Sequence, residues 1–204
     1  ITGCAVGDAL GALVEGIQKE DLDLIYGRIE DFFDHRNLAY FKEHPDKLLK
    51  YWRLPGAHTD DTQQFLAILE AYNHIRTLTP DIVAQALFHL FPVSRGIGRG
   101  YRLFCQAIRQ KGIPWRKAAM PDNAGSGSAM RAGVIGMIFH DRFPELLEQS
   151  VLQSCVTHSD IRAHMASVLI ATTVGCAIHS SFDAIECLQN VRNFHEKTYE
   201  RIFT

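Results

Sequence analysis

The 204-residue chain is predicted to fold as an all-α protein, and three observations support this fold class. Apolar residues recur every three to four positions over several long stretches, which is the spacing of one buried helical face. Some of these stretches follow residues that commonly start helices, such as Thr79-Pro80-Asp81. No stretch alternates strictly between apolar and polar residues over more than a few positions, as a half-buried strand would.

Composition favours one soluble globular domain over residues 1–204, with 47% hydrophobic and 22% charged residues. The formal charge of −2 gives no basic footprint, so nucleic acid is not an expected partner. There is no apolar run of eighteen or more residues and no signal-peptide pattern, so no membrane partner is expected. The five cysteines are widely spaced, odd in number and without metal-binding spacing, which predicts reduced thiols packed in the core of a cytoplasmic protein.

The first segment carries glycines four positions apart, at Gly3, Gly7 and Gly11. On a helix they would form a stripe without side chains. Since each glycine costs about 1 kcal/mol relative to alanine in a helix, the stripe predicts that something approaches the backbone closely. Asp8 and Glu15 are seven positions apart, so on a helix they would lie on nearly the same face. Glu15 fits a solvated face as well as a functional site.

Residues 55–63 bring two carboxylates and two hydroxyls to the start of a helix whose apolar face continues to Ile75. Thr59 is placed to act as the N-cap, and Asp60 and Asp61 lie where the helix dipole favours negative charge. A well-capped helix would explain this pattern. The same cluster of hard oxygen atoms also matches the ligands that Mg²⁺ or Ca²⁺ prefers, although one segment cannot complete a coordination shell.

The flanking segments predict further helices. Residues 18–54 are polar and aromatic, and they indicate short helices and loops that form either a lid or an ordinary surface connection. A helix is expected to begin at Thr79 and to end before Pro92. The tail from Phe182 to Thr204 predicts one more amphipathic helix.

Two glycine-rich loops precede predicted helices, the first over residues 94–101 and the second over residues 122–131. Exposed backbone amides at a helix start, beside arginines, bind anions, so two such loops indicate a phosphate site. A glycine turn that merely connects two helices is the alternative for either loop.

The sequence Thr157-His158-Ser159-Asp160 is predicted to open a long helix that runs to Ile178, because its Thr-x-x-Asp spacing matches a capping box. His158 would then lie at a helix start, where its ring is available to a ligand; a structural histidine is the alternative. Polar groups at helix starts are useful together only when they face one volume. We therefore expect three helix starts to converge on one cleft: Thr59, Ser128 and Thr157.

Four motifs, in this order, resemble those of the ADP-ribosylglycohydrolase family, which includes dinitrogenase-reductase-activating glycohydrolases and some crystallins. The resemblance spans residues 3 to about 178. It implies an all-α fold around a metal cleft, cleavage of the glycosidic bond at C1″ of ADP-ribose, and a site for two Mg²⁺ ions. The partner would be ADP-ribose or an ADP-ribosylated substrate. The motifs are Gly7-Asp8-Ala9-Leu10-Gly11 with Glu15, Gly56 with Thr59-Asp60-Asp61-Thr62, Gly125-Ser126-Gly127-Ser128-Ala129-Met130-Arg131, and Thr157-His158-Ser159-Asp160.

The resemblance also implies roles for individual residues. It assigns catalysis to Glu15, Asp60 and Asp61, and metal binding to Thr59, Asp60 and Asp61. It places the diphosphate on the two glycine-rich loops and makes His158 a substrate-binding residue. The loop residues expected to contact the ligand are Gly96, Gly98, Gly100, Gly125, Ser126, Gly127 and Ser128. Hydrolysis at an anomeric carbon needs an activated water, and the general base is left open among Glu15, an acidic residue of the 55–63 turn and a metal-activated water.

One departure from the family's pattern concerns the metal. The other metal ligands of the family lie in a C-terminal Asp-x-Asp-Thr/Ser motif, whereas the only aspartates after Thr157 are Asp160 and Asp183. We therefore expect this chain to lack that segment and to bind at most one Mg²⁺. The second loop also reads Gly-Ser-Gly-Ser where family members often have Gly-Asn-Gly. Two functions stay open: a hydrolase of ADP-ribosyl linkages, and a catalytically silent relative that binds ADP-ribose or serves a structural role, as in the crystallins.

Overall fold

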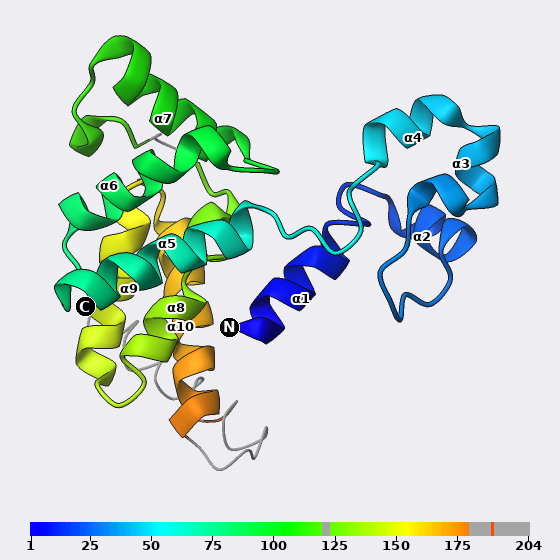
Figure 1. Ribbon diagram of the computed structural model, residues 1–204. Helices are drawn as coiled ribbons and strands as arrows, with labels where there is room; N and C mark the ends of the chain where they lie inside the picture. Colours follow the sequence, from blue (N-terminus) through cyan, green and yellow to red (C-terminus); the bar gives the residue numbers. More distant parts are fainter. Residues whose placement is uncertain (120–122, 180–188, 190–204) are drawn as a thin grey trace. The chain divides into compact units, whose positions relative to one another are not determined.

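The structure, a computed structural model, describes residues 1–119, 123–179 and 189. These residues form ten α-helices and four short 3-10 helices, and no strand occurs among them, which confirms the all-α prediction (Figure 1). The predicted helix over 182–204 lies outside the described residues apart from Gln189. The chain divides into two compact units, Ile1–Thr62 and Gln63–Thr204. The single domain expected over residues 1–204 stays a prediction.

The first unit has a small aromatic core built around the buried side chain of His35. The rings of Tyr26, Phe33 and Phe41 lie with their centroids 5.1 to 5.9 Å from that of His35. The Nε2–H of His35 donates a hydrogen bond of 2.8 Å to the carbonyl oxygen of Leu13. The helices of this unit, short as predicted after the first, are α1 (Thr2–Gly11), α2 (Lys19–Ile25), η1 (His35–Asn37), α3 (Ala39–Glu43) and α4 (Pro45–Tyr51).

Helix α1 is shorter than the sequence predicts. It ends at Gly11, and turns follow over residues 12–16. The argument that Asp8 and Glu15 share a helical face is therefore wrong, because Glu15 is not on the helix. Within the first unit, no atom lies within 4 Å of a Cβ built at Gly3, Gly7 or Gly11. The close approach predicted from the glycine stripe is not found there.

The second unit is a bundle in which α10 packs against α8 and α9 (Figure 1). Glycine permits part of this contact, because a Cβ at Gly136 of α8 would collide with the carbonyl oxygen of Ala171 on α10. A Cβ at Gly175 would lie 2.8 Å from Cδ1 of Leu146 on α9. The elements of this unit, after α5 (Asp60–Ile75), are α6 (Pro80–Leu90), η2 (Phe91–Val93), α7 (Arg99–Lys111), η3 (Trp115–Lys117), η4 (Ser126–Ser128), α8 (Gly133–Ile138), α9 (Phe143–Cys155) and α10 (Ile161–His179).

Helix α9 is missing from the sequence prediction because most of its buried face is polar. The buried residues of this helix are Leu146, Ser150, Gln153 and Ser154. Hydrophobic periodicity finds a helix only when apolar residues mark the buried side. The available signal was Pro144 in the first turn, followed by Glu145, which together are typical of a helix start.

Helix α6 begins as the sequence predicts, since the hydroxyl of Thr79 accepts a hydrogen bond of 3.3 Å from the backbone N–H of Ile82. Helix α10 is long and apolar enough to cross a membrane by length and composition alone. A core helix of a bundle meets the same criterion, and α10 contacts α8 and α9. The four described cysteines are free thiols, as predicted, but only Cys105 and Cys176 are buried, and Cys155 is exposed.

Candidate functional site

Four residues of the first unit form what we call the carboxylate cluster: Asp8, Thr59, Asp61 and Thr62. The Oδ2 atom of Asp8 accepts hydrogen bonds from Thr59 N (2.9 Å), Thr62 N (3.0 Å) and Thr62 Oγ1 (2.7 Å). Its Oδ1 atom accepts one of 2.7 Å from Thr59 Oγ1. Asp8 on α1 therefore caps the start of α5. Thr59, the predicted N-cap, accepts only a long contact of 3.4 Å from the N–H of Asp61.

The two carboxyl groups of this cluster have opposite electrostatic environments. Burial alone would raise the pKa of Asp8, but hydrogen bonds from Thr62 and Thr59 outweigh it and hold this pKa below its usual value. Burial raises the pKa of Asp61, and the negative charge of Asp8 adds to the effect, while the Thr59 hydroxyl opposes it. Asp61 is thus the carboxyl group better suited to hold a proton.

The hydroxyl of Thr59 contacts both carboxyl groups but has a single proton. Its Oγ1 lies 2.7 Å from Oδ1 of Asp8 and 3.1 Å from Oδ2 of Asp61. If the proton goes to the nearer oxygen, the contact with Asp61 needs either a proton on Asp61 or a cation. The raised pKa of Asp61 agrees with this requirement.

The carboxylate cluster offers a partial ligand set for one hard cation, because both oxygens of Asp8 already accept hydrogen bonds from Thr59 and Thr62. Mg²⁺ binds carboxylate and hydroxyl oxygens, and water commonly completes its shell. Among the described residues, no group of three or more His, Cys, Asp or Glu side chains is arranged to hold a metal. A cation here would therefore depend on Thr59, Asp61 and solvent, with Asp60 at the first position of α5.

The other two acidic residues expected in catalysis lie differently. Asp60 is the first residue of α5 and is buried. Glu15 is exposed in the turn after α1, and in the described part of the chain its side chain makes no hydrogen bond or ion pair. The structure does not bring Glu15 into the carboxylate cluster. Its catalytic role stays a prediction, as do the catalytic and metal-binding roles of Asp60 and Asp61.

In the second unit, the two glycine-rich loops lie side by side, and we call their meeting point the loop cluster: Gly100, Asn123, Gly125, Gly127 and His158. The side chain of Asn123 fills the space beside Gly100, where a Cβ would collide with it. The Oδ1 atom of Asn123 accepts a hydrogen bond of 3.2 Å from Gly125 N. Its Nδ2 atom is buried and has no hydrogen-bond partner among the described residues. Asn123 therefore joins the loops and keeps an unused donor.

His158 closes the other side of the loop cluster. Its Nε2 atom lies 3.9 Å from a Cβ built at Gly125 and 3.6 Å from one built at Gly127. The side chain is buried, with only 2% of its surface exposed. Burial, together with the positive charge of Arg131, lowers the pKa of His158 to about 4, so its ring is neutral at pH 7.

The turn that carries His158 differs from the prediction. Helix α10 begins at Ile161, and Asp160 accepts the N–H of Arg162 at 2.9 Å as a capping side chain does. Thr157 and His158 lie before the helix, so the predicted helix start at Thr157 and its capping box are wrong. The turn still places His158 beside the second loop, because η4 and Thr157 are tied to the same buried side chains.

Ser128 belongs to that buried support, and its role in substrate binding stays a prediction. Its hydroxyl donates to the carbonyl oxygen of Ala163 at 3.3 Å and accepts from Ser154 Oγ at 2.9 Å. The carbonyl oxygen of Ser128 accepts from Gln153 Nε2 at 2.9 Å. The side chain predicted to bind substrate is thus occupied inside the protein, while Gly125 and Ser126 are exposed.

The first loop is held by the start of α5. Gln63 accepts the N–H of Arg95 at 2.9 Å through Oε1 and donates to the carbonyl oxygen of Val93 at 3.1 Å through Nε2. Gly96 follows in a left-handed conformation with φ of 76°, which glycine adopts without strain. Gly98 immediately precedes α7. The loop therefore reaches the helix start with its backbone exposed at Gly96 and Gly98.

Of the predicted ligand residues of the second unit, the structure brings together Gly100, Gly125, Gly127 and His158, and it tests only part of the predicted convergence. Gly100, the second loop and His158 meet in the loop cluster. Thr59, Asp60 and Asp61 belong to the first unit or its boundary, so the single cleft predicted for Thr59, Ser128 and Thr157 stays a prediction.

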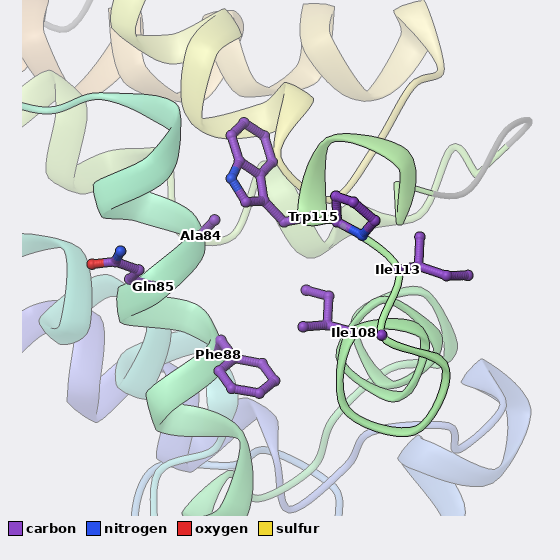
Figure 2. A pocket seen from close by; sticks show the side chains of 8 residues that line it. Ala84, Gln85, Phe88, Ile108, Ile113 and Trp115 are labelled. Carbon is purple, nitrogen blue, oxygen red and sulfur yellow. The ribbon is translucent and has the colours of Figure 1, made fainter.

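Figure 2 shows an apolar cavity of about 300 Å³ between α6 and α7, away from these residues. The side chains of Phe88 and Ile108 are directed toward each other across it, and that of Gln85 points away. No predicted site residue lines this cavity. The lining residues are Ala84, Gln85, Phe88, Ile108, Gly112, Ile113, Pro114 and Trp115.

Sequence reasoning missed three residues that organise the two clusters. Asp8 and Arg131 stood inside recognised motifs, and Asn123 stood in the second loop, but none was given a role. The signal available in the sequence was the same for all three: each has a side chain that can hydrogen-bond, and each lies within a glycine-containing motif. Which backbone groups they would reach depends on contacts far apart in the sequence, such as the 51 positions between Asp8 and Thr59.

A relative from Archaeoglobus fulgidus, described only as an uncharacterized protein, is 28% identical over 194 residues, which cover 94% of this chain and 58% of the relative. The chain thus spans somewhat over half the length of that relative. The profile of the ADP-ribosylglycohydrolase family matches residues 1–202. The match covers nearly the whole chain, so the chain belongs to the ADP-ribosylglycohydrolase family.

Proposed function

We propose that this protein is a hydrolase that cleaves the glycosidic bond between ADP-ribose and a modified acceptor. In this reaction the oxygen of water forms a bond to C1″, the bond from C1″ to the acceptor breaks, and the acceptor leaves with a proton. The loop cluster is the observation that carries the proposal. Two glycine-rich loops meet beside the unused donor Nδ2 of Asn123, which suits the diphosphate of ADP-ribose.

The loop cluster provides hydrogen-bond donors, and none of its five residues carries a negative charge. Gly125 and Ser126 are exposed and offer backbone amides, and the Nδ2 atom of Asn123 adds a side-chain donor. The guanidinium of Arg131 lies behind the loop and is completely buried. Because water does not screen it there, its positive charge favours a bound anion more strongly than an exposed arginine would.

The carboxylate cluster suits the other part of the reaction. Thr59, Asp60 and Asp61 would hold Mg²⁺, which would supply Lewis-acid chemistry for the ribose hydroxyls or a water molecule. Asp61, whose pKa is raised, would accept the proton of the attacking water at a carboxylate oxygen. Asp8 would keep Thr59 and Thr62 in place through its hydrogen bonds. Glu15 remains the alternative base.

A second function is a relative that binds ADP-ribose without hydrolysing it. One observation favours it: no group of three or more His, Cys, Asp or Glu side chains in the described ranges is arranged to hold a metal. Such a protein would bind ADP-ribose at the loop cluster, but it would not catalyse hydrolysis.

Calorimetric titration with ADP-ribose and with AMP tests the binding site. We expect ADP-ribose to bind more tightly than AMP, since it carries the diphosphate that the two loops would share. Gly127→Val should abolish binding, because even a Cβ there lies 3.3 Å from Cε1 of His158. Gly133→Ala is the matched control, as its Cβ would make an ordinary contact of 3.5 Å with Phe65 away from the loops. No binding of either ligand at millimolar concentration would exclude both functions.

Release of ADP-ribose from a modified-arginine or modified-serine peptide, measured with and without Mg²⁺ on a longer form that carries an Asp-x-Asp-Thr motif, separates the two functions. The hydrolase predicts Mg²⁺-dependent release that Asp61→Asn abolishes. Tight binding of ADP-ribose without release from either peptide would favour the silent relative.

A further inference from the structure

Arg131 lies in the turn between η4 and α8, and its side chain is completely buried. A buried guanidinium is tolerated only when its donors are used. This side chain links the second loop, α5, α9 and the turn before α10, all within the second unit. Its acceptors are Gln153 Oε1 (2.7 Å), Gln64 Oε1 (2.8 Å), Gly127 O (3.0 Å), Gln153 O (3.0 Å) and Thr157 Oγ1 (2.7 Å).

The bond to Thr157 determines where the hydroxyl proton of that residue goes. Arginine can only donate, so Thr157 Oγ1 is the acceptor in its contact with Arg131. The hydroxyl has one proton of its own to donate. The remaining partner of Thr157 Oγ1 among the described residues is Nδ1 of His158, 2.8 Å away. An Nδ1–H that donated to the second lone pair of Oγ1 would leave the buried hydroxyl proton without an acceptor among the described residues, so Nδ1 accepts this proton.

The tautomer of His158 follows from this chain of hydrogen bonds. The ring is neutral at pH 7, so it carries one proton, and Nδ1 is already an acceptor. The proton must be on Nε2. That atom faces Gly125 and Gly127, and it makes no hydrogen bond within the part of the chain that the structure describes.

We propose that Arg131 and Thr157 are positioning residues that fix the Nε2–H tautomer of His158, so that the ring presents a hydrogen-bond donor to an oxygen of a bound phosphoryl group. In the other tautomer the lone pair of Nε2 would face that oxygen and repel it. The same guanidinium holds the carbonyl oxygen of Gly127, so one buried side chain sets both the loop and the ring beside it. The role assigned to the phosphoryl oxygen rests on the proposed function.

Nitrogen NMR of the imidazole rings in the ¹⁵N-labelled chain at pH 7.5 tests the tautomer without any ligand. His158→Gln identifies the signals of this ring among the ten histidines. We expect a protonated Nε2 and an unprotonated Nδ1 in the wild type and in Thr157→Ser, which keeps the hydroxyl. Thr157→Val keeps the shape but removes the hydroxyl, so it should give a mixture of tautomers or the Nδ1–H form. A protonated Nδ1 in the wild type, or a valine variant with an unchanged tautomer, overturns the proposal.

Titration of the same three proteins with ADP-ribose tests the consequence for binding. Loss of a hydrogen bond to a charged group predicts an affinity about 10-fold or more weaker in Thr157→Val and nearly unchanged in Thr157→Ser. Thermal unfolding checks that each variant is folded. Equal affinity in Thr157→Val and the wild type would refute the role in ligand binding. If the wild type has the Nε2–H tautomer but does not bind ADP-ribose, the positioning of His158 stands and the proposed function fails.

Discussion

At the scale of single residues, Asp8 shows how one carboxylate can define a site without being the reactive group. Its two oxygens accept four hydrogen bonds from Thr59 and Thr62, and both residues precede or form the first turn of α5. The capping of α5 thus comes from a side chain on α1. The negative charge of Asp8 also contributes to the raised pKa of Asp61.

Asp8→Ala and Asp8→Asn should separate these two effects. Alanine leaves the donors of Thr59 and Thr62 without an acceptor, and we expect the free energy of unfolding to fall by about 2 kcal/mol. Asparagine keeps one oxygen for three of the four bonds, and its amide can donate to Thr59, so it should be less destabilising. Urea denaturation measures both changes. Equal destabilisation by alanine and asparagine would contradict the capping role.

Asp8→Asn should also lower the pKa of Asp61, because it removes a neighbouring charge and frees the Thr59 proton for Asp61. Titration of the Asp61 carboxyl carbon by NMR follows this change. An unchanged pKa would mean that burial alone sets it.

His158 predicts a specific pH dependence of stability. Its pKa is about 4 in the folded protein and about 6.5 when unfolded, so the unfolded state binds the proton first. The contribution of neutral His158 to the free energy of unfolding is therefore fully present above pH 6.5. It is on the order of 3 kcal/mol, and it is lost as the pH falls to about 4. His158→Gln should lack this component. The effects of the other histidines cancel when the urea midpoints of both proteins are compared from pH 7.5 to pH 4. Midpoint curves that stay parallel over this range would refute the prediction.

At the scale of elements, the packing of α8 on α10 depends on a glycine at a defined position. A Cβ at Gly136 would collide with Ala171 O and lie 2.9 Å from Cβ of Val174, so the two helix backbones approach closely there. Close backbone contact is a reason for glycine to persist inside a helix despite its low propensity.

Gly136→Ala should therefore destabilise the protein by about 2 kcal/mol or more through overpacking. Gly133→Ala, three positions earlier on α8, meets only ordinary contacts and should leave stability unchanged or raise it by up to about 1 kcal/mol. Urea denaturation of the two variants provides the comparison. A Gly136→Ala variant as stable as the wild type would show that α8 and α10 can move apart slightly without lowering the free energy of unfolding.

The helices were predictable from sequence wherever an apolar face or a capping residue marked them, as in α5, α6 and α10. Helix α9 was not, because Ser150, Gln153 and Ser154 occupy its buried face, where they hydrogen-bond to the second loop and to Ser167 of α10. The loop cluster was predictable as two glycine-rich segments. That Asn123 joins them, and that Arg131 supports them, depends on long-range contacts that no local pattern encodes.

At the scale of the whole molecule, the number of divalent ions that the chain binds is the property that is easiest to test. The chain spans 58% of the length of its Archaeoglobus fulgidus relative, and the carboxylate cluster offers only a partial ligand set. Two divalent ions about 4 Å apart repel each other strongly and need more anionic ligands than Thr59, Asp60 and Asp61 provide.

We expect this chain to bind at most one Mg²⁺ ion, weakly, and to have little or no hydrolase activity. A longer form with an Asp-x-Asp-Thr motif should bind two ions and be active. Calorimetric titration with Mg²⁺ gives the stoichiometry, and Asp61→Asn should remove the binding. Robust turnover by the 204-residue chain would show that its own ligands are sufficient.

The boundary between the two compact units falls between Thr62 and Gln63, inside the first turn of α5. Thr62 donates to Asp8, whereas Gln63 holds the first glycine-rich loop and Gln64 holds Arg131. A fragment produced from Gln63 onward would begin inside a helix and lack the carboxylate that caps it. Anyone who expresses the second unit alone should start before Thr59 and place an Asp or Ser at the helix start.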